Sequence, residues 1–306
     1  MSLTPADVQN LRQALATVVA VPVTPFQADG TPDWDTCAAL TRRLVDGGIT
    51  VITPNGNTGE FYALTAAEAR QAAETAAAAC GGQAELLAGV GHDIATAAEA
   101  ARHARDQGIR MIMIHQPVHP YVSREGWIDY HAAIAGAVPD LGVVLYVRNE
   151  RITGADIAAL ADRAPNVIGV KYGVRDASTF AAVSRDAGID RFTWLAGAAE
   201  LTAPSYWACG AHGFTSGLAN VDPALPLAML DALRGNDFGE AMKIWEKARR
   251  FEELRLADAS ADNVSVVKEA LAQLGLCRAD VRPPSRLLPE SVKHEISAML
   301  TSWGLA

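Results

Sequence analysis

Apolar positions along the chain follow two alternating patterns. Short, nearly continuous apolar runs, typical of buried strands, are followed by stretches with apolar residues at helical spacing. The predicted strands cover residues 17–26, 50–54, 85–91, 111–116, 142–148, 167–173, 192–198 and 213–219. The predicted helices cover residues 34–47, 65–79, 95–106, 123–137, 153–163, 176–187, 201–209 and 223–234. The pattern therefore predicts a strand followed by a helix, repeated eight times.

Continuous apolar strands are typical of a parallel sheet that helices cover. Eight such repeats fit a closed (β/α)8 barrel, an α/β fold of about 250 residues. An open doubly wound sheet is the alternative, but no GxGxxG follows the first predicted strand. Beyond residue 236 the pattern is purely helical, at 238–256, 264–274 and 289–303. We therefore expect a barrel over residues 1–236 that carries the active site, and a C-terminal helical domain over residues 237–306.

Composition narrows the range of partners. The 306 residues are 50% hydrophobic and 20% charged, which suits a globular protein with a large core. The net charge of −9, without a long basic run, makes nucleic acid and anionic membranes poor partners. We find no apolar stretch that could span a bilayer and no export signal at the start. The four cysteines are widely spaced, so we expect free, buried thiols and a cytoplasmic protein.

One lysine differs from the others in its setting. Lys171 falls at the end of the predicted buried strand 167–173. The other lysines lie in stretches with the pattern of charged helix surfaces: Lys243, Lys247, Lys268 and Lys293. Burial disfavours an ammonium group, and a neutral amine in a dry pocket is the nucleophile that forms an imine with a carbonyl substrate. The alternative is a structural lysine that is paired with a carboxylate.

The strand before Lys171 also ends in reactive side chains. In such barrels the catalytic groups lie at the C-terminal ends of the strands. Strand 142–148 ends in Tyr146 and Arg148, and Arg151 follows. A phenol can move protons and a guanidinium can bind a carboxylate. Adjacent strands would place Tyr146 beside Lys171, although a tyrosine that only caps the core is the alternative.

Three further strand ends offer candidates. After strand 50–54 comes a loop with two glycines, where backbone amides and the Thr58 hydroxyl could hold a carboxylate. The alternative is that this loop is a plain glycine-rich turn. After strand 111–116, His119 or Tyr121 could reach the site, although a loop histidine is more often structural. The last strand brings Ser216 and several small residues, which would leave room for a substrate or serve packing alone.

Four of these segments together resemble the dihydrodipicolinate synthase/N-acetylneuraminate lyase family of Schiff-base aldolases and dehydratases. They are residues 56–60 (Gly-Asn-Thr-Gly-Glu), 145–146 (Leu-Tyr), 169–171 (Gly-Val-Lys) and 210–213 (Gly-Ala-His-Gly). No single segment is decisive, but all four in this order are specific. The resemblance extends from residues 21–26 to 282–284. It implies a (β/α)8 barrel with a C-terminal helical domain, usually a homotetramer (a dimer of dimers), and no metal or organic cofactor.

The resemblance also implies roles for individual residues. Lys171 matches the lysine that forms the imine, and Tyr146 matches the tyrosine that relays protons. Thr58 matches a threonine that holds the pyruvyl carboxylate and takes part in the relay. Its neighbours Asn57 and Gly59 belong to the same substrate-binding loop.

Several positions depart from the synthase pattern. Asn57 replaces the first threonine of the loop, and His119 falls where the synthase has a tyrosine donated across a dimer interface. The carboxylate-binding arginine of the synthase matches either Arg148 or Arg151. Other features look more like the 5-dehydro-4-deoxyglucarate dehydratase branch, namely Thr-Gly-Glu-Phe at 58–61, Tyr-x-Arg at 146–148, and residues 171–176, 265–268 and 281–284.

The resemblance therefore predicts a lyase that acts on a small 2-oxo acid by imine and enamine chemistry. Dehydration or aldol cleavage of a sugar-derived acid is the main expectation. One alternative is 4-hydroxy-tetrahydrodipicolinate synthase, which joins pyruvate and aspartate semialdehyde. An alternative of another class is a barrel that binds 2-oxo acids without catalysis.

Overall fold

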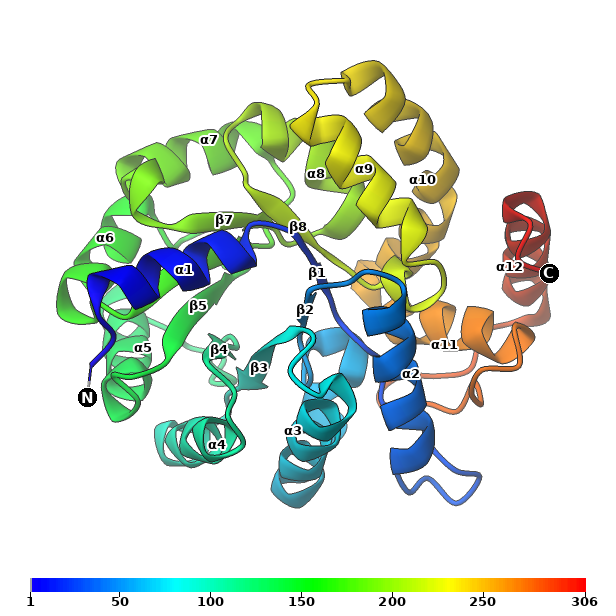
Figure 1. Cartoon of the computed structure of the whole chain (residues 1–306), viewed down its shortest axis with the longest axis horizontal. Helices are drawn as coiled ribbons and strands as arrows, with labels where there is room; N and C mark the ends of the chain where they lie inside the picture. Colours follow the sequence, from blue (N-terminus) through cyan, green and yellow to red (C-terminus); the bar gives the residue numbers. More distant parts are fainter. Residues whose placement is uncertain (1) are drawn as a thin grey trace. The chain divides into compact units, whose positions relative to one another are not determined.

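The computed structural model describes residues 2–306, and over this range eight strands follow one another in chain order around a closed barrel (Figure 1). The strands are β1 (Val18–Ala20), β2 (Val51–Ile52), β3 (Glu85–Val90), β4 (Met111–Ile114), β5 (Gly142–Val147), β6 (Val167–Tyr172), β7 (Thr193–Ala196) and β8 (Gly213–Ser216). From β3 to β8 each strand pairs with the next in parallel. The predicted (β/α)8 barrel is confirmed.

Helices alternate with the strands as the sequence pattern predicts. They are α2 (Trp34–Asp46), α3 (Ala66–Cys80), α4 (Ile94–Asp106), α5 (Arg124–Ala137), α6 (Gly154–Arg163), α7 (Ala177–Asp186), α8 (Ala199–Ala208) and α9 (Ala224–Arg234). The carboxyl-terminal helices are α10 (Phe238–Ser260), α11 (Asn263–Gln273) and α12 (Glu290–Trp303). The short 3-10 helices are η1 (Asn57–Gly59), η2 (Phe61–Ala63), η3 (Ile189–Arg191) and η4 (Leu218–Asn220).

The chain forms two compact units. The first comprises the chain up to Val19 together with Glu85–Thr215, and the second comprises Ala20–Ala84 with Ser216–Ala306. The division expected from the sequence, at residues 236 and 237, stays a prediction.

In the first unit the strands are buried on both faces, and a helix that the sequence pattern did not predict packs against β6. This helix is α1 (Pro5–Leu15; Figure 1). It begins with a capping box between Thr4 and Asp7. Its buried residues are only Leu11 and Leu15, so its apolar periodicity is weak. A Cβ at Gly169 of β6 would lie 2.7 Å from Leu15 Cδ2, so glycine lets the helix approach the strand.

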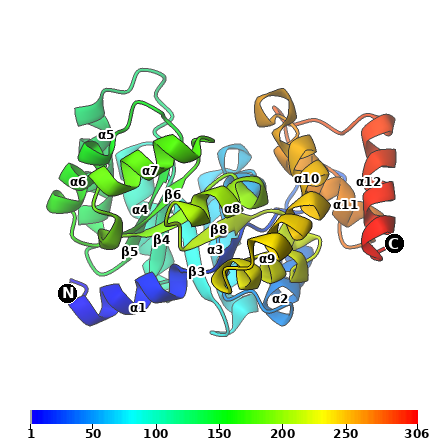
Figure 2. The same ribbon diagram turned by 90° about the horizontal axis from the view of Figure 1, so that it is seen from above.

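In the second unit the carboxyl-terminal helices pack in succession, α10 on α9, α11 on α10 and α12 on α11 (Figure 2). The path of α10 breaks near its end, where Ala257 is extended and Asp258, Ala259 and Ser260 have φ of 48°, 54° and 73°. Left-handed conformations cost energy for residues with a Cβ, so tertiary contacts must hold this turn in place.

The first strand is shorter than residues 17–26, the range expected from the sequence. Regular pairing stops after Ala20 because Pro22 and Pro25 lack the N–H that a ladder requires. The extended segment that follows is held instead by a side chain, since Asn220 Oδ1 accepts from Val23 N at 3.2 Å. Within residues 2–306, no helix has the length and apolar character needed to cross a membrane.

Candidate active site

The first candidate cluster surrounds Lys171 at the carboxyl end of β6. Lys171 pairs in register with Tyr146 of β5, and its side chain is buried, with 4% exposed. Its Nζ lies 4.4 Å from the centroid of the Tyr146 ring. The parallel pairing of two apolar strands therefore places a buried amine against a buried phenol, as the sequence predicts.

Side chains that follow β4 support Tyr146. The Gln116 side-chain amide donates a hydrogen bond to the Tyr146 carbonyl. The ring of His115, which is fully buried, meets the Tyr146 ring edge to face, with centroids 6.1 Å apart. A Cβ at Gly173 would lie 3.1 Å from Tyr146 Cε2 and 3.0 Å from Arg148 Cγ. Glycine at the end of β6 thus gives the tyrosine ring and the arginine stem room to pack.

Four predicted residues of this unit lie on the surface. Arg148 and Arg151 are both exposed, so exposure does not distinguish which of the two would bind a carboxylate. His119 is also exposed, and its Nδ1 accepts from Tyr121 N at 3.1 Å. The Tyr121 side chain is 85% exposed. These residues are available to a ligand or to another protein chain.

The second candidate cluster is the loop after β2. Asn57, Thr58 and Gly59 form η1, and Thr58 is 4% exposed. The Thr24 hydroxyl donates to the Gly59 carbonyl at 2.7 Å. A Cβ at Gly56 would lie 2.3 Å from Val21 Cγ1, so only glycine fits this close approach. The loop is therefore a built structure rather than a simple turn.

Side chains of the carboxyl-terminal helices contact Thr58. Its Oγ1 lies 3.5 Å from Arg255 Nη2 and 3.5 Å from Asn263 Oδ1. Arg255 is buried, and its Nη1 donates to both carboxylate oxygens of Glu252, at 2.6 and 2.8 Å. Ser216 is fully buried at the end of β8, where its Oγ accepts from Ala219 N at 2.9 Å.

The expectation that Lys268 lies on a charged helix surface is wrong. Its side chain is fully buried, and Nζ pairs with Glu60 and donates to the Asp280 carbonyl at 2.7 Å. Burial lowers the pKa of the Lys268 ammonium, and the nearby Glu60 carboxylate opposes that shift. The ammonium also lies 4.0 Å from the centroid of the Phe26 ring. The partner Glu60 lies 208 positions before Lys268 in the chain, so the sequence around Lys268 does not indicate this environment.

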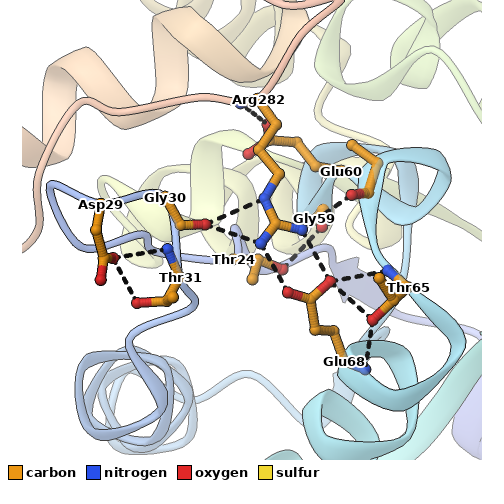
Figure 3. Close-up of polar contacts among 10 residues, drawn as sticks. Thr24, Asp29, Gly30, Thr31, Gly59, Glu60, Thr65, Glu68 and Arg282 are labelled. Carbon is orange, nitrogen blue, oxygen red and sulfur yellow. Dashed lines mark hydrogen bonds and ion pairs between the residues drawn. The ribbon is translucent and has the colours of Figure 1, made fainter.

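Arg282 joins the same loop to the carboxyl-terminal segment (Figure 3). Its backbone N–H donates to Glu60 Oε1 at 2.8 Å. Its guanidinium donates to both oxygens of Glu68, at 2.7 and 2.8 Å, and to the Gly30 carbonyl. These hydrogen bonds lower the pKa of Glu68 to about 2, against the effect of partial burial. Glu60 has φ 58°, so this network holds a left-handed residue directly after Gly59.

Sequence reasoning missed His115, Gln116, Arg255 and Asn263. Residues 115 and 116 were assigned to the end of a strand without a role, although two polar residues that close an apolar run were a usable signal. Arg255 follows Glu252 at the i,i+3 spacing of an ordinary surface pair, so no local signal marked it as buried. Among residues 2–306 we find no group of three or more His, Cys, Asp or Glu side chains placed to hold a metal ion.

Comparison with known proteins identifies the family. Residues 14–303 match the model of the dihydrodipicolinate synthetase family. The chain belongs to this family, as the sequence motifs predict, and is accordingly a lyase of the class I aldolase type.

Individual relatives differ in their named activities. The chain is 28% identical to a probable 5-dehydro-4-deoxyglucarate dehydratase of Delftia acidovorans over 99% of both chains. It is 30% identical to a 4-hydroxy-tetrahydrodipicolinate synthase of Phenylobacterium zucineum, over 92% of this chain and 95% of the relative.

Solved structures share the fold. The dihydrodipicolinate synthase of Oceanobacillus iheyensis superposes with a TM-score of 0.94 at 34% identity, covering 98% of this chain and 100% of the other. YagE of E. coli K12, solved in complex with pyruvate, gives a TM-score of 0.86 at 26% identity, covering 95% of this chain and 99% of the other.

Proposed function

We propose that this protein removes water from a sugar-derived 2-oxo acid by Schiff-base chemistry, as 5-dehydro-4-deoxyglucarate dehydratases do. The observation that carries the proposal is the buried Lys171 amine against the Tyr146 ring at the carboxyl ends of β5 and β6. Dehydratase-like motifs around Thr58, Tyr146 and Lys171, and the Delftia acidovorans relative, support this substrate class.

The proposed chemistry needs a buried amine as the nucleophile and a phenol that carries protons. Lys171 Nζ attacks C2 of the 2-oxo acid, and loss of water gives a protonated imine. The imine withdraws electrons, so C3 loses a proton and an enamine forms. The enamine expels the C4 hydroxyl as water once a proton is supplied, and a second water then releases the product from Lys171. Tyr146 moves these protons.

The remaining residues bind the substrate in this proposal. The loop of Asn57, Thr58 and Gly59 holds the carboxylate next to C2, with Thr58 as hydroxyl donor. Arg148 or Arg151 and Ser216 take the rest of the substrate. The synthase reaction with aspartate semialdehyde is the second candidate, supported by the Phenylobacterium zucineum relative.

Trapping the imine tests the proposal. Borohydride reduction with pyruvate is expected to add a pyruvyl group to Lys171, located by peptide mass spectrometry. Lys171→Ala abolishes both trapping and turnover, whereas Lys247→Ala, which removes an exposed lysine of α10, changes neither. Absence of an adduct from folded protein that still binds pyruvate contradicts the proposal and favours the non-catalytic barrel. With an adduct in hand, turnover of sugar-derived 2-oxo acids against aspartate semialdehyde separates the two reactions.

We also propose that the protein works in the cytoplasm as a homotetramer. Free thiols at all four cysteines suit a reducing compartment. Exposed apolar side chains in the loop after β4, Val118 (57%) and Tyr121 (85%), suit burial against a second copy of the chain. In such an assembly His119, between them, faces the neighbouring subunit.

A further inference from the structure

Arg255 has unusual surroundings for a buried arginine. Its guanidinium lies beside the Thr58 hydroxyl and against the backbone at the end of β8, where a Cβ at Gly217 would lie 2.3 Å from Nη2. The Arg255 side chain is 5% exposed, and that of its partner Glu252 is 2% exposed. A helix of the carboxyl-terminal region therefore brings a charged group to the loop that follows β2.

The hydrogen bonds of this guanidinium differ in length between its nitrogen atoms. Nη1 makes both strong contacts, with Glu252. Nε lies 3.4 Å from the Asn263 carbonyl, and Nη2 lies 3.3 Å from Asn263 Oδ1 and 3.5 Å from Thr58 Oγ1. Ordinary N–H···O bonds are about 2.9–3.0 Å long. The Nη2 side, which faces Thr58, is thus held only weakly by the protein.

Backbone strain accompanies this placement. Between Arg255 and Asn263, the three residues Asp258, Ala259 and Ser260 all have positive φ. Such conformations are disfavoured for residues with a Cβ and concentrate at functional sites. The turn brings both partners of Thr58 to the same hydroxyl, one from α10 and one from the start of α11.

We propose that Arg255 is a positioning residue that turns the Thr58 hydroxyl toward the substrate carboxylate. This inference rests on the proposed function. A guanidinium has donors only, so it occupies a lone pair of Thr58 Oγ1, and the hydroxyl proton must go to another acceptor. Asn263 Oδ1 receives it over a long 3.5 Å contact. A carboxylate is a stronger acceptor than an amide oxygen, so the hydroxyl turns to the substrate when it binds.

The test compares two ligands that differ only in the group beside the reacting carbonyl. Pyruvate carries the carboxylate and pyruvamide carries a neutral amide, and both have the carbonyl that Lys171 attacks. The half-saturating concentration of each is measured from the borohydride-trapped adduct of the full-length protein by intact mass spectrometry. The variants are Arg255→Met and the charge-balanced pair Arg255→Met with Glu252→Gln, which does not leave a lone buried carboxylate.

In both variants we expect the half-saturating pyruvate concentration to rise about 10- to 100-fold, the range of one charge-assisted hydrogen bond. The pyruvamide value and the adduct level at saturation stay unchanged. Thr58→Val combined with Arg255→Met loses no more pyruvate affinity than the worse single variant, because both act through one hydroxyl.

Equal weakening of pyruvate and pyruvamide overturns the inference, because it indicates a merely structural arginine. Unchanged pyruvate affinity in the charge-balanced variant overturns it as well. Failure of the wild-type protein to form any adduct refutes the proposed function itself and the inference with it, so the two failures are distinguishable.

Discussion

At the scale of single residues, buried charges dominate the loop after β2. Glu60 pairs with Lys268 where both side chains are almost inaccessible, with 2% and 0% exposed. Burying two charges is costly, and the pair is sustained by further bonds to Arg282 N and to the Asp280 carbonyl. Glu60 directly follows Thr58 and Gly59 in the chain, so loss of the pair would affect the candidate site as well as stability.

Removing the lysine alone is therefore expected to be severe. Lys268→Met leaves the Glu60 carboxylate buried without its cation, which lowers the free energy of unfolding by about 3–5 kcal/mol in urea titrations. Lys268→Met together with Glu60→Gln recovers most of this loss, because no charge is stranded. The control is Lys243→Met, which breaks an exposed 2.8 Å pair with Glu240 and leaves the free energy of unfolding nearly unchanged, because solvent screens an exposed pair. Equal effects of Lys268→Met and Lys243→Met contradict this account.

At the scale of elements, close contacts between strands of the first unit require glycine, which has no side chain. The start of β8 lies against the backbone just before β1, where Phe214 N donates to the Thr17 carbonyl at 3.2 Å. A Cβ at Gly213 would lie 2.2 Å from Thr17 O and 2.8 Å from Thr17 N. Both obstacles are backbone atoms, so no rotamer change relieves the clash.

Two glycine-to-alanine changes are expected to have opposite signs. Gly213→Ala forces β8 away from residue 17 and lowers the free energy of unfolding by about 1–3 kcal/mol or more. Gly136→Ala, at an exposed position of α5 with nothing within 4 Å of the added Cβ, raises the free energy of unfolding by about 0.5–1 kcal/mol through helix propensity. Denaturation midpoints of the two variants measure both effects. Unchanged stability in Gly213→Ala contradicts the clash with the Thr17 backbone. A stability loss in Gly136→Ala contradicts the gain expected from helix propensity.

At the scale of the whole molecule, the proposed assembly into a tetramer bears on function. The loop after β4 exposes Val118, His119 and Tyr121 together. Single exposed apolar residues are common on protein surfaces, whereas neighbouring ones favour an interface. This loop directly follows His115 and Gln116, which contact Tyr146. Contact between subunits would therefore stiffen the segment that supports the tyrosine.

Light scattering of the purified protein is expected to give four times the mass of a single chain. Replacing Val118 and Tyr121 together by serine removes apolar area from the loop, and we expect the mass to shift toward smaller species and turnover to fall. Asp106→Asn, an exposed change on α4, serves as the control and leaves the mass unchanged. A monomer in the wild-type protein at working concentration refutes both the tetramer and a role for His119 at an interface.

The sequence by itself determined the order of the elements, the barrel fold and the position of Lys171 near the end of a buried strand. Strand and helix periods are local properties, so they can be recognised in the sequence. Among the strands of residues 2–306 only β6 contains a lysine, Lys171, one residue before its end. Adjacent parallel strands then placed Tyr146 beside Lys171. Helix α1 escaped prediction because two buried leucines give too weak a period.

The tertiary structure alone decided which charged residues became buried. Arg255 lies in a helix rich in charged residues, and Lys268 directly precedes Glu269, so neither position is locally marked as buried. Their burial involves partners roughly two hundred positions away in the chain, Glu60 for Lys268 and Thr58 for Arg255. Long-range packing sets the exposure of a side chain, and local sequence carries no record of it. For that reason Lys171, which we propose forms the imine, was predicted from the sequence, whereas the burial of Arg255 beside the loop after β2 required the fold.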